Sequence, residues 1–171
     1  MDVRTALRSQ YHAALDMLGA AVDACPDDRW DRPSDVNRSW QLAYHALFFT
    51  HFYLQPSEAD FVPWSGHRRH LQVFGDRLPW PPHDPIERGA PLAKADVRAY
   101  LAACHAEVDA RLATIDLEGP SGFPWLPMTK LEHMLYTLRH LMHHTGELYE
   151  RLAGTTGGGL PWVGMGGAGG R

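Results

Sequence analysis

The chain has 171 residues, 44% of them hydrophobic, and its 16 Lys and Arg against 20 Asp and Glu give a formal net charge of -4. This size suits a single folded domain, and the lack of any basic block argues against a nucleic-acid partner. No apolar run approaches the ~20 residues of a membrane span and no signal-peptide pattern opens the chain, so we expect a soluble, cytoplasmic protein without membrane association.

The first two predicted helices cover residues 3–24 and 40–54. In the first, apolar residues recur every three to four positions, which places them on one helix face, and Pro26 ends the pattern. These residues are Leu7, Tyr11, Leu15, Leu18 and Val22. Ser39 is a suitable N-cap for the second helix, WQLAYHALFFTHFYL, which is apolar on nearly every face. A helix of that composition belongs in the middle of the fold.

Residues 55–92 interrupt the helical pattern and contain seven prolines. Only a short helix is predicted there, around residues 66–78. Connections of this length inside one domain are uncommon, and they are often functional lids. We therefore expect a long connection between the second and third helices.

Two further helices are predicted after this proline-rich segment. The third covers about residues 94–115, where a heptad-like apolar stripe runs from Val97 to Ile115. The fourth begins at Thr129, because TKLE has the Ser/Thr-x-x-Glu form of a capping box. It is expected to end near Leu152, before Gly154.

Together these elements predict an all-α fold. No segment shows sustained period-two alternation, so no sheet is expected. The pattern favours a four-helix bundle in which the long crossover lets the second and third helices run parallel, in an up-down-down-up order. Residues 1–154 are expected to form this one domain. Residues 155–171 form a glycine-rich tail, for which Trp162 is the expected anchor on the bundle.

Histidine is the unusual part of the composition, with 11 residues, three of them between positions 140 and 144. His140 and His144 project from one side of a helix, about 40° and ~6 Å apart, so they can share a metal ion. His143 points elsewhere and is expected to be exposed. His45 is the candidate third ligand, because it lies on the apolar second helix, where an unpaired imidazole is unfavourable. At this point a solvated helix face is still the alternative to a metal site.

Other residues in the chain constrain the chemistry further. His133 and Glu147 share the stripe of His140, but each lies seven residues from it, ~10 Å along the axis, so they can only line the groove or support the ligands from outside. Cys25 and Cys104 lack C-x-x-C spacing and are expected to be ordinary buried or semi-exposed thiols. The motifs of zincin proteases, α/β-hydrolases and P-loop proteins are absent from the sequence.

Three segments resemble the DinB/YfiT-like superfamily of bacterial four-helix-bundle metalloproteins: SWQLAYHALFFTHFYL, RHLMHHTGELYERL and the PWV that follows. The resemblance covers residues 3–163. It implies that His45, His140 and His144 bind a divalent metal, and zinc, nickel and iron all suit nitrogen ligands. Glu147 stands where the family usually has Gln, which makes the groove more acidic here.

The resemblance also implies a function, because characterised relatives include thiol-dependent transferases and isomerases that use low-molecular-weight bacterial thiols. A metal-dependent thiol S-transferase acting on a small electrophile is expected, since a metal favours the nucleophilic thiolate. A non-catalytic metal- or small-ligand-binding stress-response protein and a metal-dependent hydrolase are the alternatives. Arg68 or Arg69 in HRRH offers a contact for an anionic thiol, with a solvated loop as the alternative. A homodimer is also expected, since bundles with spare apolar surface often dimerise.

Overall fold

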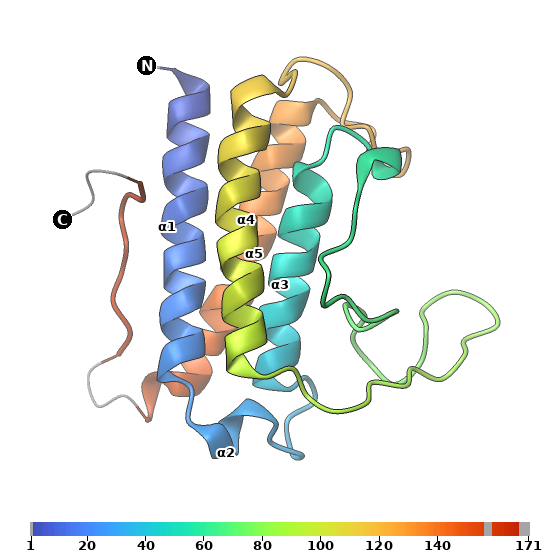
Figure 1. The fold of residues 1–171 in the computed structure, drawn as a ribbon, viewed down its shortest axis with the longest axis vertical. Helices are drawn as coiled ribbons and strands as arrows, with labels where there is room; N and C mark the ends of the chain where they lie inside the picture. The colour runs from blue at the N-terminus through green and yellow to red at the C-terminus, as the bar shows by residue number, and fades with distance from the viewer. Residues whose placement is uncertain (1, 156–158, 168–171) are drawn as a thin grey trace.

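The computed structural model describes residues 2–155 and 159–167. Within them, four long helices form a bundle, which confirms the all-α prediction (Figure 1). They are α1 (Val3–Ala24), α3 (Ser39–Leu54), α4 (Lys94–Thr114) and α5 (Lys130–Ala153), and the shorter elements are α2 (Asp27–Trp30) and the 3-10 helix η1 (Glu58–Asp60). No helix in the described part of the chain is long and apolar enough to cross a membrane.

The order of the helices is the one predicted from the sequence. α1 and α5 run in one direction and α3 and α4 in the other, so α3 and α4 are parallel and the loop between them spans the length of the bundle (Figure 1). α3 and α5 pack against each other, and so do α1 and α4. This arrangement brings the apolar second helix of the sequence directly against the histidine-rich fourth helix.

Most of α3 is buried, as its composition predicts. The exceptions are His45, Phe49 and Phe52, which are only half-buried. These three residues stand at positions i, i+4 and i+7, so they form one stripe along the helix. α3 therefore leaves one narrow face open, and His45 lies on it.

Of the two N-caps predicted from the sequence, one is confirmed and one is wrong. Thr129 caps α5 as predicted, since its hydroxyl accepts a hydrogen bond from the backbone N–H of Glu132. Ser39 was expected to cap α3, but it lies inside the helix, and its hydroxyl donates to the carbonyl of Arg29. The cap residue is Arg38, whose backbone N–H donates to the side chain of Gln41 at 2.7 Å. The contact with the preceding turn draws the Ser39 hydroxyl away from a capping role.

The crossover, residues 55–93, contains turns where a short helix was predicted at residues 66–78, so that prediction is wrong. His70 adopts a left-handed conformation with φ of 62°, which interrupts any helix there. Arginine side chains bind the loop's carbonyl groups instead: Arg68 donates to Ala90 O at 2.7 Å, and Arg88 donates to Val73 O at 3.0 Å. These long-range contacts replace the hydrogen bonds that a local helix would form.

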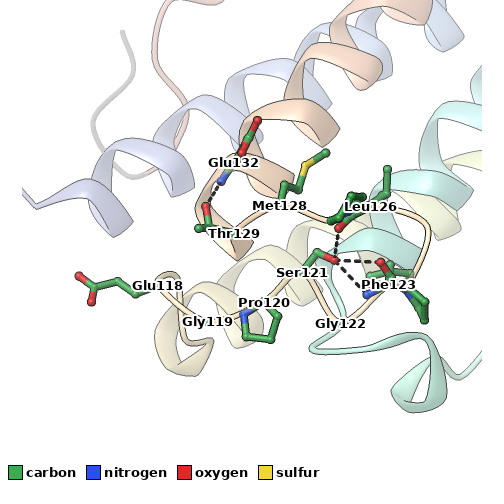
Figure 2. Close-up of a pocket in the computed structure, with 12 residues that line it drawn as sticks. Glu118, Gly119, Pro120, Ser121, Gly122, Phe123, Leu126, Met128, Thr129 and Glu132 are labelled. Atoms are coloured by element: carbon green, nitrogen blue, oxygen red, sulfur yellow. Dashed lines mark hydrogen bonds between the residues drawn. The ribbon is translucent and has the colours of Figure 1, made fainter.

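The α4–α5 loop, residues 115–129, is tied to the end of α3. The ammonium of Lys130 is buried and donates to the carbonyls of Gln55 and Ser121. The Ser121 hydroxyl lies 2.7 Å from Leu126 O and accepts from the N–H of Phe123, which holds the loop in a tight curve (Figure 2). Gly122, with φ of 82°, comes so close to Pro56 that a Cβ would overlap its carbonyl oxygen.

The described part of the C-terminal segment lies along α1 (Figure 1). Gln10 donates to Gly164 O, and the N–H of Gly166 donates to Ser9 O, both at 3.1 Å. Trp162, the predicted anchor, is 77% exposed. The backbone of the two glycines makes these contacts with α1 because glycine allows the chain to approach a helix closely. The remaining tail positions, 156–158 and 168–171, lie outside the described residues.

Candidate metal centre

His45, His140 and His144 meet where α3 packs against α5. The Nε2 atom of His140 lies 3.1 Å from Nε2 of His45 and 3.2 Å from Nε2 of His144. One ring nitrogen from each residue lies within 4.8 Å of the others, so the cluster can hold a metal ion. The structure thus brings together the three residues expected as ligands, two from adjacent turns of one helix and one from its antiparallel neighbour.

The outward-facing nitrogens show how two of the rings are oriented. Nδ1 of His45 lies 2.6 Å from the carbonyl oxygen of Gln72, and Nδ1 of His144 lies 2.7 Å from a carboxylate oxygen of Glu147. Both partners are acceptors, so each Nδ1 carries the proton and each Nε2 presents a lone pair. Two lone pairs are therefore directed toward the space between the three rings.

The third ring cannot satisfy both of these lone pairs. If His140 carries its proton on Nε2, it can donate to His45 or to His144 but not to both. Its Nδ1 is buried and has no hydrogen-bond partner within the described residues. Every protonation of three neutral rings thus leaves a buried nitrogen unsatisfied, which is unfavourable. A cation at the centre accepts all three lone pairs, so this donor set fits a divalent metal.

The distances agree with that fit. Two nitrogens that each bind a tetrahedral zinc at about 2.0–2.1 Å lie about 3.3 Å apart. The observed Nε2 separations of 3.1 and 3.2 Å are close to this value. The inward nitrogens thus stand near the spacing that a tetrahedral site requires.

Burial keeps the three rings in the form that binds metal. It lowers the pKa of His45 to about 3 and the pKa of His140 to about 4, and it also lowers the pKa of His144. The rings of Phe74 and Phe49 cover His45, with centroids 4.0 and 4.7 Å from its own. All three imidazoles are therefore neutral at pH 7, and protons compete little with a metal there.

The model of the DinB superfamily matches residues 10–148, a range that includes all three histidines. The chain belongs to the DinB superfamily. No match was found among curated proteins or among solved structures. Membership confirms the resemblance drawn from the second- and fourth-helix segments. For this DinB protein, the convergent imidazoles make the cluster one that could bind a metal.

The other histidines of this DinB protein lie outside the cluster. The side chain of His143 is 66% exposed, as predicted, and its Nε2 lies 3.6 Å from Glu147. His133 is fully buried against the rings of Tyr53 and Phe123 and does not reach the cluster. Glu147 supports His144 from outside, one of the two roles that its position on the helix allowed. Nothing in the sequence pointed to Gln72, because a backbone carbonyl acceptor has no residue signature.

A hollow of about 230 Å³ opens beside the cluster and is lined by Tyr136, Arg139, His140 and His143. His140 belongs to both the hollow and the cluster, so a molecule in the hollow lies beside one ring of the cluster. A larger hollow of about 740 Å³ is formed by the α4–α5 loop and Glu132 (Figure 2). None of its lining residues is a histidine. Of these two hollows, only the smaller is lined by a residue of the cluster.

Proposed function

We propose that this DinB protein is a metal-dependent thiol S-transferase, which joins a low-molecular-weight thiol to a small electrophile. The observation that carries the proposal is the convergence of three neutral imidazole nitrogens beside a hollow open to solvent. Catalytic zinc sites are commonly formed by three protein ligands, so that one coordination position stays open for a substrate or water. Zinc, nickel or iron fits the all-nitrogen donor set.

The residues around the cluster have separate tasks in this proposal. A bound divalent metal supplies the positive charge that favours the thiolate form of a thiol at neutral pH. Gln72 and Glu147 hold the rings of His45 and His144 in the orientation for binding. In the transfer, the thiol proton passes to solvent and an S–C bond forms. The bond to the leaving group breaks at the same time, so that a halide departs as an anion or an opened epoxide oxygen takes a proton from solvent.

The protein's own thiols are unsuited to be the nucleophile. Cys25 and Cys104 are both buried, and burial raises the pKa of each thiol. Raised pKa values keep them in the unreactive protonated form. The thiol should therefore come from a small molecule, and we propose a cytoplasmic location, where such thiols are kept reduced.

The experiment begins with elemental analysis of protein purified without a His-tag, followed by a screen of common bacterial thiols with a reference electrophile. We expect about one metal ion per chain and faster thiol consumption than in buffer. His140→Ala should lose both. His143→Ala is the matched control for metal binding, because it removes an exposed imidazole from the same part of α5 and should retain the metal.

Other outcomes point to the alternatives. Stoichiometric metal without thiol consumption would contradict the transferase and favour a non-catalytic metal-binding protein. Metal-dependent cleavage of an ester substrate without thiol would favour a hydrolase. Absence of metal from the parent protein would overturn all three metal-based functions.

A further inference from the structure

The hollow beside the cluster lies along one face of α5. Tyr136, Arg139, His140 and His143 stand at positions i, i+3, i+4 and i+7, so their side chains are neighbours on the helix surface. A second hollow of about 290 Å³ includes Tyr136 and Arg139 in its lining as well. Arg139 therefore stands between the metal centre and the space that continues along α5.

Arg139 is the unpaired cation of this surface. Its guanidinium lies 5.6 Å from the centroid of the Tyr136 ring, a cation–π contact that positions the group without using its N–H donors. It is exposed, and within the described residues it forms no salt bridge and no side-chain hydrogen bond. Glu147, the acidic residue nearest the cluster, is already engaged by His144 at 2.7 Å and His143 at 3.6 Å. The donors of Arg139 are thus available to a ligand.

The size and charge of the hollow indicate what kind of group it accepts. Its volume of about 230 Å³ is below the ~300–1,000 Å³ of a pocket that encloses a whole ligand, so it suits one end of a molecule. A guanidinium matches a planar carboxylate through two parallel hydrogen bonds. A single cation balances a singly charged carboxylate better than a phosphate dianion. The Tyr136 ring provides a flat apolar surface beside it.

We propose that Arg139 and Tyr136 form a subsite for the carboxylate of a small ligand whose reacting end reaches the metal centre at His140. The identity of that reacting end, a thiol or an electrophile, rests on the proposed thiol transfer. The carboxylate contact itself does not depend on a thiol. Arg139 is therefore a binding and specificity residue, and it takes no part in bond making.

Benzoate and its neutral analogue benzamide test the subsite on the zinc-loaded protein. Binding is followed by NMR shifts of the α5 backbone amides, which need no catalytic turnover. We expect benzoate to bind about two- to fivefold more tightly than benzamide, the range for a charged contact at a solvent-exposed site. Arg139→Gln should reduce benzoate binding to the level of benzamide without changing the zinc content.

The control variant is Arg69→Gln, which removes one positive charge from the crossover. Arg69 is exposed, and the sequence had offered it as a contact for an anionic thiol. This variant should leave benzoate binding unchanged. Equal benzoate affinity in the parent and Arg139→Gln, as expected if the carboxylate bound zinc alone, would overturn the subsite. So would an equal loss in Arg69→Gln. These results are separate from the thiol screen. Arg139→Gln can leave benzoate binding unchanged in a protein that consumes thiols, and it can weaken benzoate binding in a protein that does not.

Discussion

The carboxylate of Glu147 lies 2.7 Å from Nδ1 of His144, on the opposite side of the ring from the nitrogen that faces His140. Glu147 stands three residues after His144 on α5, so the helix itself holds the two side chains together. The contact keeps the proton on Nδ1 and makes Nε2 a stronger donor to a metal.

Changes at Glu147 should therefore alter metal affinity without removing a ligand. Glu147→Ala is expected to weaken metal binding about 10- to 100-fold, the range for partners of ligand histidines. Glu147→Gln should lose less, because its amide oxygen still accepts from Nδ1. Competition with a chelator measures both, and Glu150→Ala, an exposed carboxylate on the same helix, is the control. An equal effect of all three variants would contradict this role for Glu147.

His133 should make the metal-free protein sensitive to acid. It is fully buried, and neither of its ring nitrogens forms a hydrogen bond within the described residues. Only the backbone of Ser121 favours its charged form, and this effect is smaller than that of burial. Burial lowers its pKa to about 4, from 6.5 in the unfolded chain. Between these values the unfolded chain binds more protons, so the free energy of unfolding falls as pH decreases from 6.5 toward 4.

His133→Leu removes this contribution. On going from pH 7 to pH 5, only the parent loses stability through residue 133. The free energy of unfolding of the variant minus that of the parent should therefore rise by about 2 kcal/mol over this range. Urea unfolding of the metal-free proteins at the two pH values measures the difference, and the other histidines cancel in the comparison. Equal pH dependence of the two proteins would contradict the assignment.

Gly122 should tolerate no side chain. Gly122→Ala places a Cβ against the carbonyl oxygen of Pro56 and requires φ near 82°, so we expect a loss of about 3 kcal/mol in the free energy of unfolding. Gly146→Ala is the matched control, because a Cβ there meets nothing within 4 Å. Inside α5 that change should stabilise the protein by about 0.5–1 kcal/mol. Thermal unfolding of both variants tests this prediction. Changes of the same sign in the free energy of unfolding would contradict it.

Lys130 should contribute to stability through its ammonium. Lys130→Met keeps the length of the side chain but leaves the carbonyls of Gln55 and Ser121 without this donor. We expect a loss of about 3 kcal/mol, since each buried acceptor left unsatisfied costs about 1–3 kcal/mol. Lys94→Met is the comparison, because the side chain of Lys94 is 28% exposed and water can replace its contacts. Urea unfolding should show the smaller loss for Lys94→Met, and the reverse order would contradict the argument.

The sequence by itself determined the four long helices and their order. Apolar periodicity, the capping threonine at 129 and the prolines act over a few residues, so they can be read locally. The same local geometry paired His140 with His144, because four residues complete about one helical turn. His45 was already the candidate third ligand because of its place on an apolar helix, and the family resemblance then supported it.

Only the tertiary structure decided the parts of the site that depend on distant segments. The carbonyl of Gln72 orients His45 from the crossover, where arginine contacts and the left-handed His70 replaced the helix predicted at residues 66–78. The contacts of Gly164 and Gly166 with α1 likewise follow from the packing of whole elements. Hydrogen bonds to backbone carbonyls and the paths of loops leave no periodic pattern in the sequence, because the partner groups lie far away in the chain.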